Sequence, residues 1–304
     1  FEEVKGKNLI KKFLSINDTF SVRDSHSLDL VSNLIGTEST PLILDPAFFI
    51  NENSKKNTPE KQKLAVIMRV EEFGLRIGGK TSSINYRTFK NSNFTESISY
   101  KLSYLISKKF FNEIEGSIDL FVQTRYDYDL AVNLKNALIE EGFENKVNII
   151  EPVSIEQYIE LLSDSNFVIS SRFHGCIMSI LAGVTPLGLY FESHGHKMPG
   201  LYEMLGISDY CFKVNNESID LILQKFSQLY RNKEDTYNVL LSKINILKEK
   251  SFIWFRESLN KDPKINEDTS ELIKYYKEYL ELVKWKDHED MITDLKSSNE
   301  TLTK

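Results

Sequence analysis

Between residues 63 and 192, short apolar segments alternate with amphipathic segments, and this alternation constrains the fold more than any other feature of the chain. The apolar segments have few polar positions, which is typical of strands that are buried on both faces of a sheet. The expected strands are KLAVIMR (63–69), SIDLFVQT (117–124), VNIIEPV (147–153), FVISS (167–171) and PLGLYFE (186–192). The expected helices cover about 93–112, 128–143, 154–166 (with a capping box at Ser154 and Gln157) and 172–184. This order predicts an α/β fold with a parallel sheet.

Residues 1–50 predict the last elements of a separate α/β domain, and we expect the rest of that domain to precede Phe1. Its expected elements are a strand at 20–24, a helix at 24–36 and a strand at 41–46. Ser25 or Ser27 is expected to cap the helix at its N-terminus. The polar segment 51–62 has the composition of a linker, so we expect a domain boundary there.

Beyond this boundary we expect a Rossmann-like domain over 63–260 and a helical tail over 261–304. Two packed helices over 218–259 complete the expected domain. The tail has apolar residues at the spacing of an amphipathic helix, namely Leu272, Tyr275, Tyr276, Tyr279, Leu282 and Val283. Two interpretations stay open: the tail returns across the domain boundary, or it connects to another module. A homo-oligomer joined through the tail is compatible with either interpretation.

The composition bears on the class of protein and on its setting. A net charge of −6 and a pI near 5.6 give no support for nucleic-acid binding, although a local pocket on an acidic protein can still be positive. The two cysteines, Cys176 and Cys211, are too few for a disulfide scaffold and favour a reduced, cytoplasmic setting. No apolar run approaches the roughly 20 residues that a membrane helix needs. We find no cluster of metal ligands and expect no metal.

Charged side chains gather where two of the expected strands end. Arg172 and His174 follow the strand 167–171 at the start of the next helix, and Arg69 closes the strand 63–69. Carboxyl ends of parallel strands share one edge of a sheet, where ligands bind in open α/β folds, so we expect both arginines there. The helix N-terminus and a guanidinium group both favour an anion such as phosphate or carboxylate. An imidazole beside them can carry a proton near neutral pH.

Further candidate residues lie around the same edge. Ser170 and Ser171 form the turn between strand and helix, and Glu192 ends a third strand. Lys197 follows the polar loop behind that strand. We therefore take these four residues as candidate contacts to a substrate.

The order of these motifs resembles the polysaccharide pyruvyl transferase family. The family has a D-x-V-I-S-x-R-x-H strand and turn, then a G-V-x-P segment with a following Tyr, then a Lys before a short helix ending in L-G-I. The matching segments are SNFVISSRFH (165–174), GVTPLGLY (183–190) and HKMPGLYEMLGI (196–207), with FSVRDSHSLDLV (20–31), LILDPAF (42–48) and the strand ending at Arg69 upstream. Asn166 stands where the family has Asp. The resemblance covers roughly residues 20–215 and implies a glycosyltransferase-B-like (GT-B-like) fold whose N-terminal half is mostly absent here.

The resemblance also implies a reaction, the transfer of a pyruvyl group from phosphoenolpyruvate to a sugar. Arg69 and Arg172 are the candidate anchors for the phosphate and the carboxylate of the donor, and Lys197 is a further cation. His174 is the candidate proton carrier or contact to the departing phosphate. The acceptor is a glycan or a lipid-linked sugar precursor of the cell envelope, at the inner face of the membrane, and no cofactor is required.

Two other functions stay open from the sequence. A glycosyltransferase with a nucleotide-sugar donor would use the same strand-end anion site for a diphosphate, although no clear acidic residue is spaced to hold a ribose. A non-catalytic assembly module would use the tail over 261–304 as its working part.

Overall fold

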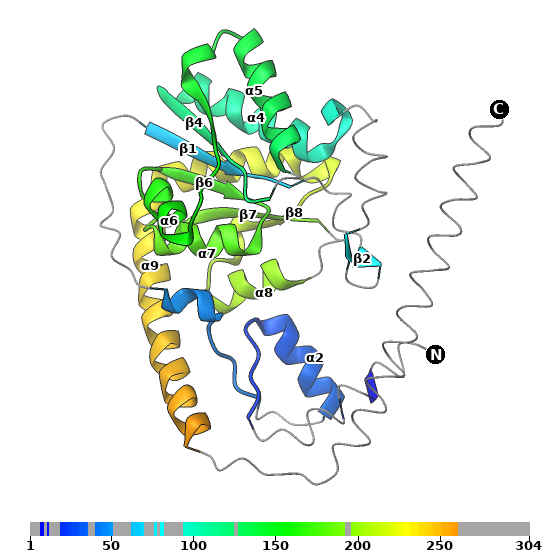
Figure 1. Cartoon of the computed structure of the whole chain (residues 1–304), viewed down its shortest axis with the longest axis vertical. Helices are drawn as coiled ribbons and strands as arrows, with labels where there is room; N and C mark the ends of the chain where they lie inside the picture. Colours follow the sequence, from blue (N-terminus) through cyan, green and yellow to red (C-terminus); the bar gives the residue numbers. More distant parts are fainter. Residues whose placement is uncertain are drawn as a thin grey trace, which may run out of the picture.

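The computed structural model describes residues 7–8, 11, 19–35, 40–50, 62–69, 76–77, 80–81, 94–124, 127–191 and 196–260. In this structure, helices cover both faces of a central sheet (Figure 1). Helix α2 (Ser25–Ile35) lies at one end of the molecule, beside α8 (Lys197–Met204). No helix in these ranges is both long enough and apolar enough to cross a membrane.

Within the described residues, the main sheet has six parallel strands. They are β1 (Gln62–Ile67), β4 (Gly116–Phe121), β5 (Val147–Ile150), β6 (Phe167–Ser170), β7 (Pro186–Tyr190) and β8 (Cys211–Lys213). Their order across the sheet is β5-β4-β1-β6-β7-β8, so the chain starts in the middle, builds one half and then returns to build the other. This is the strand order of Rossmann folds, and its direction reverses between β1 and β6. The predicted α/β fold with a parallel sheet is confirmed.

The flanking helices bury the sheet on both sides (Figure 1). Strand β1 shows why its sequence is a continuous apolar run: Leu64 and Val66 belong to one core cluster, and Ala65 and Ile67 to the other. The helices are α4 (Ile98–Glu113), α5 (Tyr128–Glu140), α6 (Ile155–Ser163), α7 (Phe173–Leu181), α8 (Lys197–Met204) and α9 (Ile219–Leu259). A short antiparallel pair, β2 (Arg76–Ile77) and β3 (Lys80–Thr81), stands apart from the sheet.

Helix α9 differs from the two packed helices predicted at 218–259. Its two halves continue end to end through Asn232, whose backbone is not helical (φ −113°, ψ 17°). Phe226 in the first half belongs to one core cluster, whereas Leu240 in the second half belongs to the other. The break at Asn232 therefore lets one helical segment cover both faces of the sheet.

Helix α6 begins at the predicted cap. The Ser154 hydroxyl accepts a hydrogen bond from the Gln157 amide at 3.2 Å, but the Gln157 side chain accepts from the amide of Val153 rather than from that of Ser154. The helix start is thus predicted correctly. The second hydrogen bond of the capping box, from a backbone amide to the Gln157 side chain, comes from the residue before the expected one.

The N-terminal segment keeps its predicted helix but not its predicted strands. The strands expected at 20–24 and 41–46 are reduced to a single parallel bridge between Val22 and Leu42, followed by the 3-10 helix η1 (Pro46–Phe49). Beyond this bridge both segments turn into helices: the Asp24 carbonyl accepts a hydrogen bond from the amide of Leu28 in α2, and the Asp45 side chain accepts one from the amide of Ala47 in η1.

The cap of α2 is Asp24 rather than Ser25 or Ser27. The Asp24 carboxylate accepts hydrogen bonds from the amide of Ser27 at 2.8 Å and from its hydroxyl at 2.7 Å. Asp24 is buried against α8, where a Cβ on Gly200 would lie 2.8 Å from the Asp24 carboxylate. The preference of aspartate for this position explains the cap, and the glycine explains the close approach of α2 and α8.

Residues 40–50 also belong to the core of the sheet domain. Leu44 and Phe48 are fully buried in the cluster that contains α7, and the Leu44 amide donates a hydrogen bond to the buried hydroxyl of Ser251 at 3.0 Å. The linker expected at 51–62 lies outside the described residues except for Gln62, the first residue of β1, and the tail expected at 261–304 also lies outside them. The predicted domain boundaries therefore stay predictions.

Candidate active site at the strand reversal

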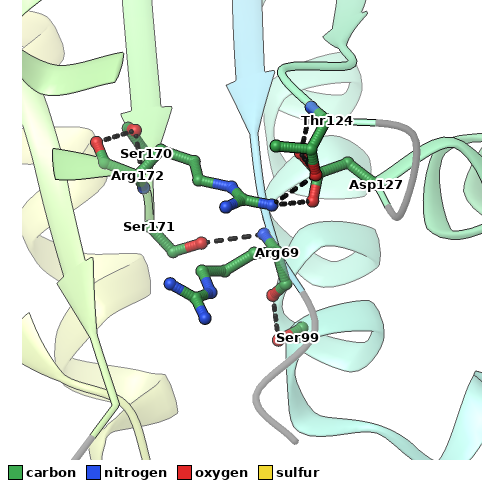
Figure 2. Close-up of polar contacts among 7 residues, drawn as sticks. All are labelled: Arg69, Ser99, Thr124, Asp127, Ser170, Ser171 and Arg172. Carbon is green, nitrogen blue, oxygen red and sulfur yellow. Dashed lines mark hydrogen bonds and ion pairs between the residues drawn. The ribbon is translucent and has the colours of Figure 1, made fainter. Parts of the chain in front are cut away.

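The reversal of strand order between β1 and β6 brings two predicted site residues together. Ile67 and Ser170 are register partners at the carboxyl ends of these neighbouring strands, and the Ser171 amide donates a hydrogen bond to the Ile67 carbonyl at 2.9 Å. Arg69 and Arg172 follow directly. Figure 2 shows their side chains passing each other at this edge, Arg172 toward the end of β4 and Arg69 toward β6. Both arginines therefore lie at one edge of the sheet, as predicted, and their binding of a common ligand stays a prediction.

Two serine hydroxyls hold the backbone of Arg69 where the chain leaves β1 (Figure 2). The Arg69 amide donates to the hydroxyl of Ser171 at 2.9 Å, and the hydroxyl of Ser99 donates to the Arg69 carbonyl at 2.8 Å. Both serines are buried. Because backbone groups beyond a strand end have no ladder partner, these hydroxyls fix the point from which the Arg69 side chain starts.

Ser170 closes the turn from β6 into α7. Its hydroxyl accepts a hydrogen bond from the Arg172 amide at 3.1 Å and donates one to the Arg172 carbonyl at 3.0 Å. A Cβ on Gly175 would lie 2.6 Å from this hydroxyl, so only glycine lets the first turn of α7 pass so close. The Ser170 and Ser171 hydroxyls thus position the two arginines, and contact of either serine with a substrate stays a prediction.

The Arg172 side chain is held by two residues that the sequence analysis did not single out, Thr124 and Asp127. The NH2 nitrogen of Arg172 donates to the Thr124 hydroxyl at 2.9 Å and forms an ion pair with the Asp127 carboxylate (Figure 2). Asp127 also accepts hydrogen bonds from the amide and the hydroxyl of Thr124, at 2.9 and 3.2 Å. Both residues follow β4, the strand beside β1, so the strand-end rule that selected Arg69 also applied to them. They were missed because their importance comes from contact with Arg172, which lies 48 and 45 residues away in the sequence.

His174 lies on the first turn of α7 and is exposed. Its ring meets the edge of the Phe173 ring at a centroid distance of 5.4 Å, and the guanidinium of Arg23 lies 5.0 Å from the centre of that Phe173 ring. Arg23 itself is ion-paired with Asp45. An exposed imidazole on the first turn of a helix, two residues beyond Arg172, can exchange protons with a ligand bound at that helix N-terminus.

Lys197 is the first residue of α8 and is exposed, whereas Glu192 lies outside the described residues. The preceding residue, His196, stacks on His26 of α2 with ring centroids 5.5 Å apart. The start of α8 is thus packed against the N-terminal segment. A role for Lys197 or Glu192 in substrate binding stays a prediction.

Burial sets the protonation of the groups beneath this edge. Burial raises the pKa of the Tyr158 hydroxyl, the nearby charge of Asp127 raises it further, and Arg172 opposes both, so this hydroxyl stays protonated at neutral pH. Burial also raises the pKa of the Cys176 thiol to about 11, and both Cys176 and Cys211 are free cysteines. Among the described residues, no group of three or more His, Cys, Asp or Glu side chains is arranged to hold a metal ion.

Two solved structures are among those that match the chain. A glycosyltransferase from Rickettsia africae ESF-5 has 11% sequence identity and a TM-score of 0.38, with 80% of this chain and 56% of that chain covered. A mutant of the O-GlcNAc transferase of Thermobaculum terrenum has 14% identity and a TM-score of 0.39, with 88% and 45% covered. The chain therefore spans about half the length of these structures, and neither similarity supports an inference about activity.

No curated protein sequence matches the chain. The sequence model of the family described as polysaccharide pyruvyl transferase matches residues 1–193, which is 193 of the 304 residues. The matched part contains β1, β6 and α7 with Arg69, Arg172 and His174, and it ends before Lys197. The chain belongs to the polysaccharide pyruvyl transferase family.

Proposed function

We propose that the protein transfers the pyruvyl group of phosphoenolpyruvate to two hydroxyls of one sugar, forming a pyruvate ketal on a cell-surface polysaccharide or on its lipid-linked precursor. The observation that carries this proposal is the position of Arg69 and Arg172 at the strand reversal, with the exposed His174 two residues beyond Arg172 on the first turn of α7. Membership of the family supports the reaction class. A cytoplasmic setting, at the inner face of the membrane, belongs to the same proposal.

The donor needs two cationic anchors because it carries a phosphate and a carboxylate. Guanidinium groups hold such anions through charge-assisted hydrogen bonds, and the free N–H groups at the start of α7 add a positive dipole end. We assign Arg172, which lies nearer to this helix, to the phosphate and Arg69 to the carboxylate. Each anchor contributes roughly 1.5–3 kcal/mol, which corresponds to about ten- to hundredfold in affinity.

The proposed reaction balances without a cofactor. The methylene carbon of the enol gains a proton and becomes a methyl group, which leaves a cationic centre at the neighbouring carbon. One sugar hydroxyl attacks that carbon, the carbon–oxygen bond to phosphate breaks, and a second hydroxyl then closes the ketal. One of the two hydroxyl protons replaces the proton delivered to carbon, and the other leaves with inorganic phosphate. His174 carries the proton in this scheme, and Arg172 stabilises the departing phosphate.

The first test measures the thermal stabilisation of the protein by phosphoenolpyruvate, because a ligand that binds only the folded state raises the melting temperature. We expect Arg69→Ala and Arg172→Ala to lower the affinity for phosphoenolpyruvate by about ten- to hundredfold. Arg256→Ala, which removes an exposed arginine near the end of α9, is the matched control and should bind as the wild type does. Wild-type affinity in both site variants would overturn the assignment of the anchors.

The second test follows phosphate release from phosphoenolpyruvate when lipid-linked glycan precursors are supplied. We expect His174→Ala to retain donor binding and to lose about 10²–10⁴-fold in turnover, as for a general acid or base. Arg172→Ala should abolish release as well, and its circular dichroism shows whether the variant remains folded. Full activity in both variants would defeat the proposal.

The alternative of a nucleotide-sugar donor is separated by the same stabilisation assay. The strand order and the helix N-terminus at Arg172 also suit a diphosphate. Stabilisation by uridine-diphosphate sugars, with none by phosphoenolpyruvate, would favour a glycosyltransferase. An assembly function of the tail over 261–304 is tested by deleting 262–304 and measuring the mass by light scattering; an unchanged mass would argue against it.

A further inference from the structure

The ion pair between Arg172 and Asp127 lies at the proposed anion site, and the carboxylate is 3% exposed. Asp127 is held from the other side by the amide and the hydroxyl of Thr124, so its position does not depend on Arg172 alone. The Arg172 side chain is also largely buried, at 17% exposure. A negative charge is thus built into the place where a bound anion is expected to meet Arg172.

The hydrogen bonds of Arg172 divide its guanidinium into two parts. The NH2 nitrogen has two hydrogens and two acceptors, the Thr124 hydroxyl and the Asp127 carboxylate. The Nε atom is buried and has no hydrogen-bond partner among the residues that the structure describes. Both hydrogens of NH2 are thus engaged, so an anion at this site would meet the remaining N–H groups of the guanidinium.

We infer that Asp127 is an internal counter-anion and positioning residue: it orients Arg172 through NH2, balances its charge in the absence of a ligand, and opposes the charge of an anion that binds at Arg172. Buried charges require compensation, and removing one partner of a buried pair leaves the other uncompensated. In this site a bound anion can take over that compensation. Asp127 therefore weakens anion binding while it keeps the arginine in place, which favours release of an anionic product.

This inference deepens the proposed function but depends only on anion binding at Arg172, so inorganic phosphate is the probe. We expect Asp127→Asn to lower the melting temperature, because Arg172 loses its counter-ion. We also expect the variant to bind phosphate about tenfold more tightly than the wild type, because an opposing charge near the anion is removed. The stabilisation by phosphate, measured over a concentration series at constant ionic strength, should therefore be larger in Asp127→Asn than in the wild type.

The chain offers a matched control in Asp119 of β4. Its side chain is 4% exposed, forms an ion pair with Lys63 at 3.2 Å and accepts a hydrogen bond from Asn148. Asp119 lies within the sheet and not beyond its carboxyl edge. Asp119→Asn should lower the melting temperature as well, but it should leave the affinity for phosphate at the wild-type value.

The outcomes separate a positioning role from a merely structural one. Equal phosphate affinity in the wild type and in Asp127→Asn, or a gain of the same size in Asp119→Asn, would overturn the inference. If Asp127→Asn does not fold, Asp127→Ser, which is smaller and still able to bond Thr124, carries the same expectation. A protein that binds phosphate in this manner but does not use phosphoenolpyruvate would refute the proposed function and leave the role of Asp127 standing.

Discussion

Gly175 follows Arg172 by three residues and determines how closely α7 can approach the end of β6. The nearest atoms to a Cβ at this position would be the Ser170 hydroxyl at 2.6 Å and a methyl group of Ile67 at 3.1 Å. Neither atom can move easily, since Ser170 holds the backbone of Arg172 and Ile67 is fully buried. The geometry of the arginine therefore depends on a residue that has no side chain.

We expect Gly175→Ala to destabilise the protein by about 1–3 kcal/mol, the range of overpacking in a close-packed core. Chemical denaturation of Gly175→Ala, Ser170→Ala and the double variant measures the coupling between the two positions. Because Ser170→Ala removes the atom that the new methyl group meets, the double variant should lose less than the sum of the single variants. Additive losses would show that Ser170 is not the neighbour that limits this position.

At the scale of elements, α9 and the segment 40–50 show how the parts of the chain are joined. The second half of α9 supplies Ser251, whose hydroxyl accepts from the amide of Leu44 and donates to the carbonyl of Leu247. Phe49 meets the rings of Phe252 and Phe255 of the same helix at centroid distances of 5.0 and 5.6 Å. The contact therefore combines one buried hydrogen bond with apolar packing.

We expect Ser251→Ala to destabilise the protein by about 1–3 kcal/mol, because the buried amide of Leu44 would lose its acceptor. Ser242→Ala, on an exposed position of the same helix, is the control and should change stability by less than about 0.5 kcal/mol. The free energies of unfolding come from urea titrations of the three proteins. A neutral Ser251→Ala would mean that this hydrogen bond does not hold residues 40–50 in place.

Some physical signals for the fold are local in the sequence, and others depend on distant residues. The strands were predictable because burial on both faces requires a continuous apolar run, as in β1. The site edge was predictable because parallel strands direct their carboxyl ends to one side, which brought Arg69 and Arg172 together. The strands expected at 20–24 and 41–46 were overextended, because a local pattern does not show how many neighbours a strand finds. Asp127 was missed because its importance comes from Arg172, which lies 45 residues away in the sequence.

At the scale of the whole molecule, buried ionisable groups predict how stability depends on pH. Burial raises the pKa of Cys176 to about 11, and it also raises the pKa values of Tyr158 and Tyr202 above their ordinary value. A group with a raised folded pKa contributes stability below its unfolded pKa and loses it as the pH rises toward the folded value. The unfolded chain releases these protons first, so alkaline conditions favour unfolding.

We expect the free energy of unfolding to fall as the pH rises from about 9 to 11, by up to about 1.4 kcal/mol per pH unit for each group that ionises only on unfolding. Urea titrations at a series of pH values give the slope. Cys176→Ser, which replaces the thiol by a group that does not ionise in this range, should reduce the slope relative to the wild type. An unchanged slope would show that Cys176 does not contribute to it.

The placement of the two arginines on β1 and β6 has a consequence for how the protein acquires its activity. Arg69 and Ser171, which join these strand ends, are separated by 102 positions in the chain, and the segment between them contains β4 and β5, which form one half of the sheet. Neither half of the chain carries both charges on its own, so a partly folded molecule has no complete binding site. Affinity for a small dianion would therefore appear only with the finished architecture, which would make such an anion a reporter of completed folding.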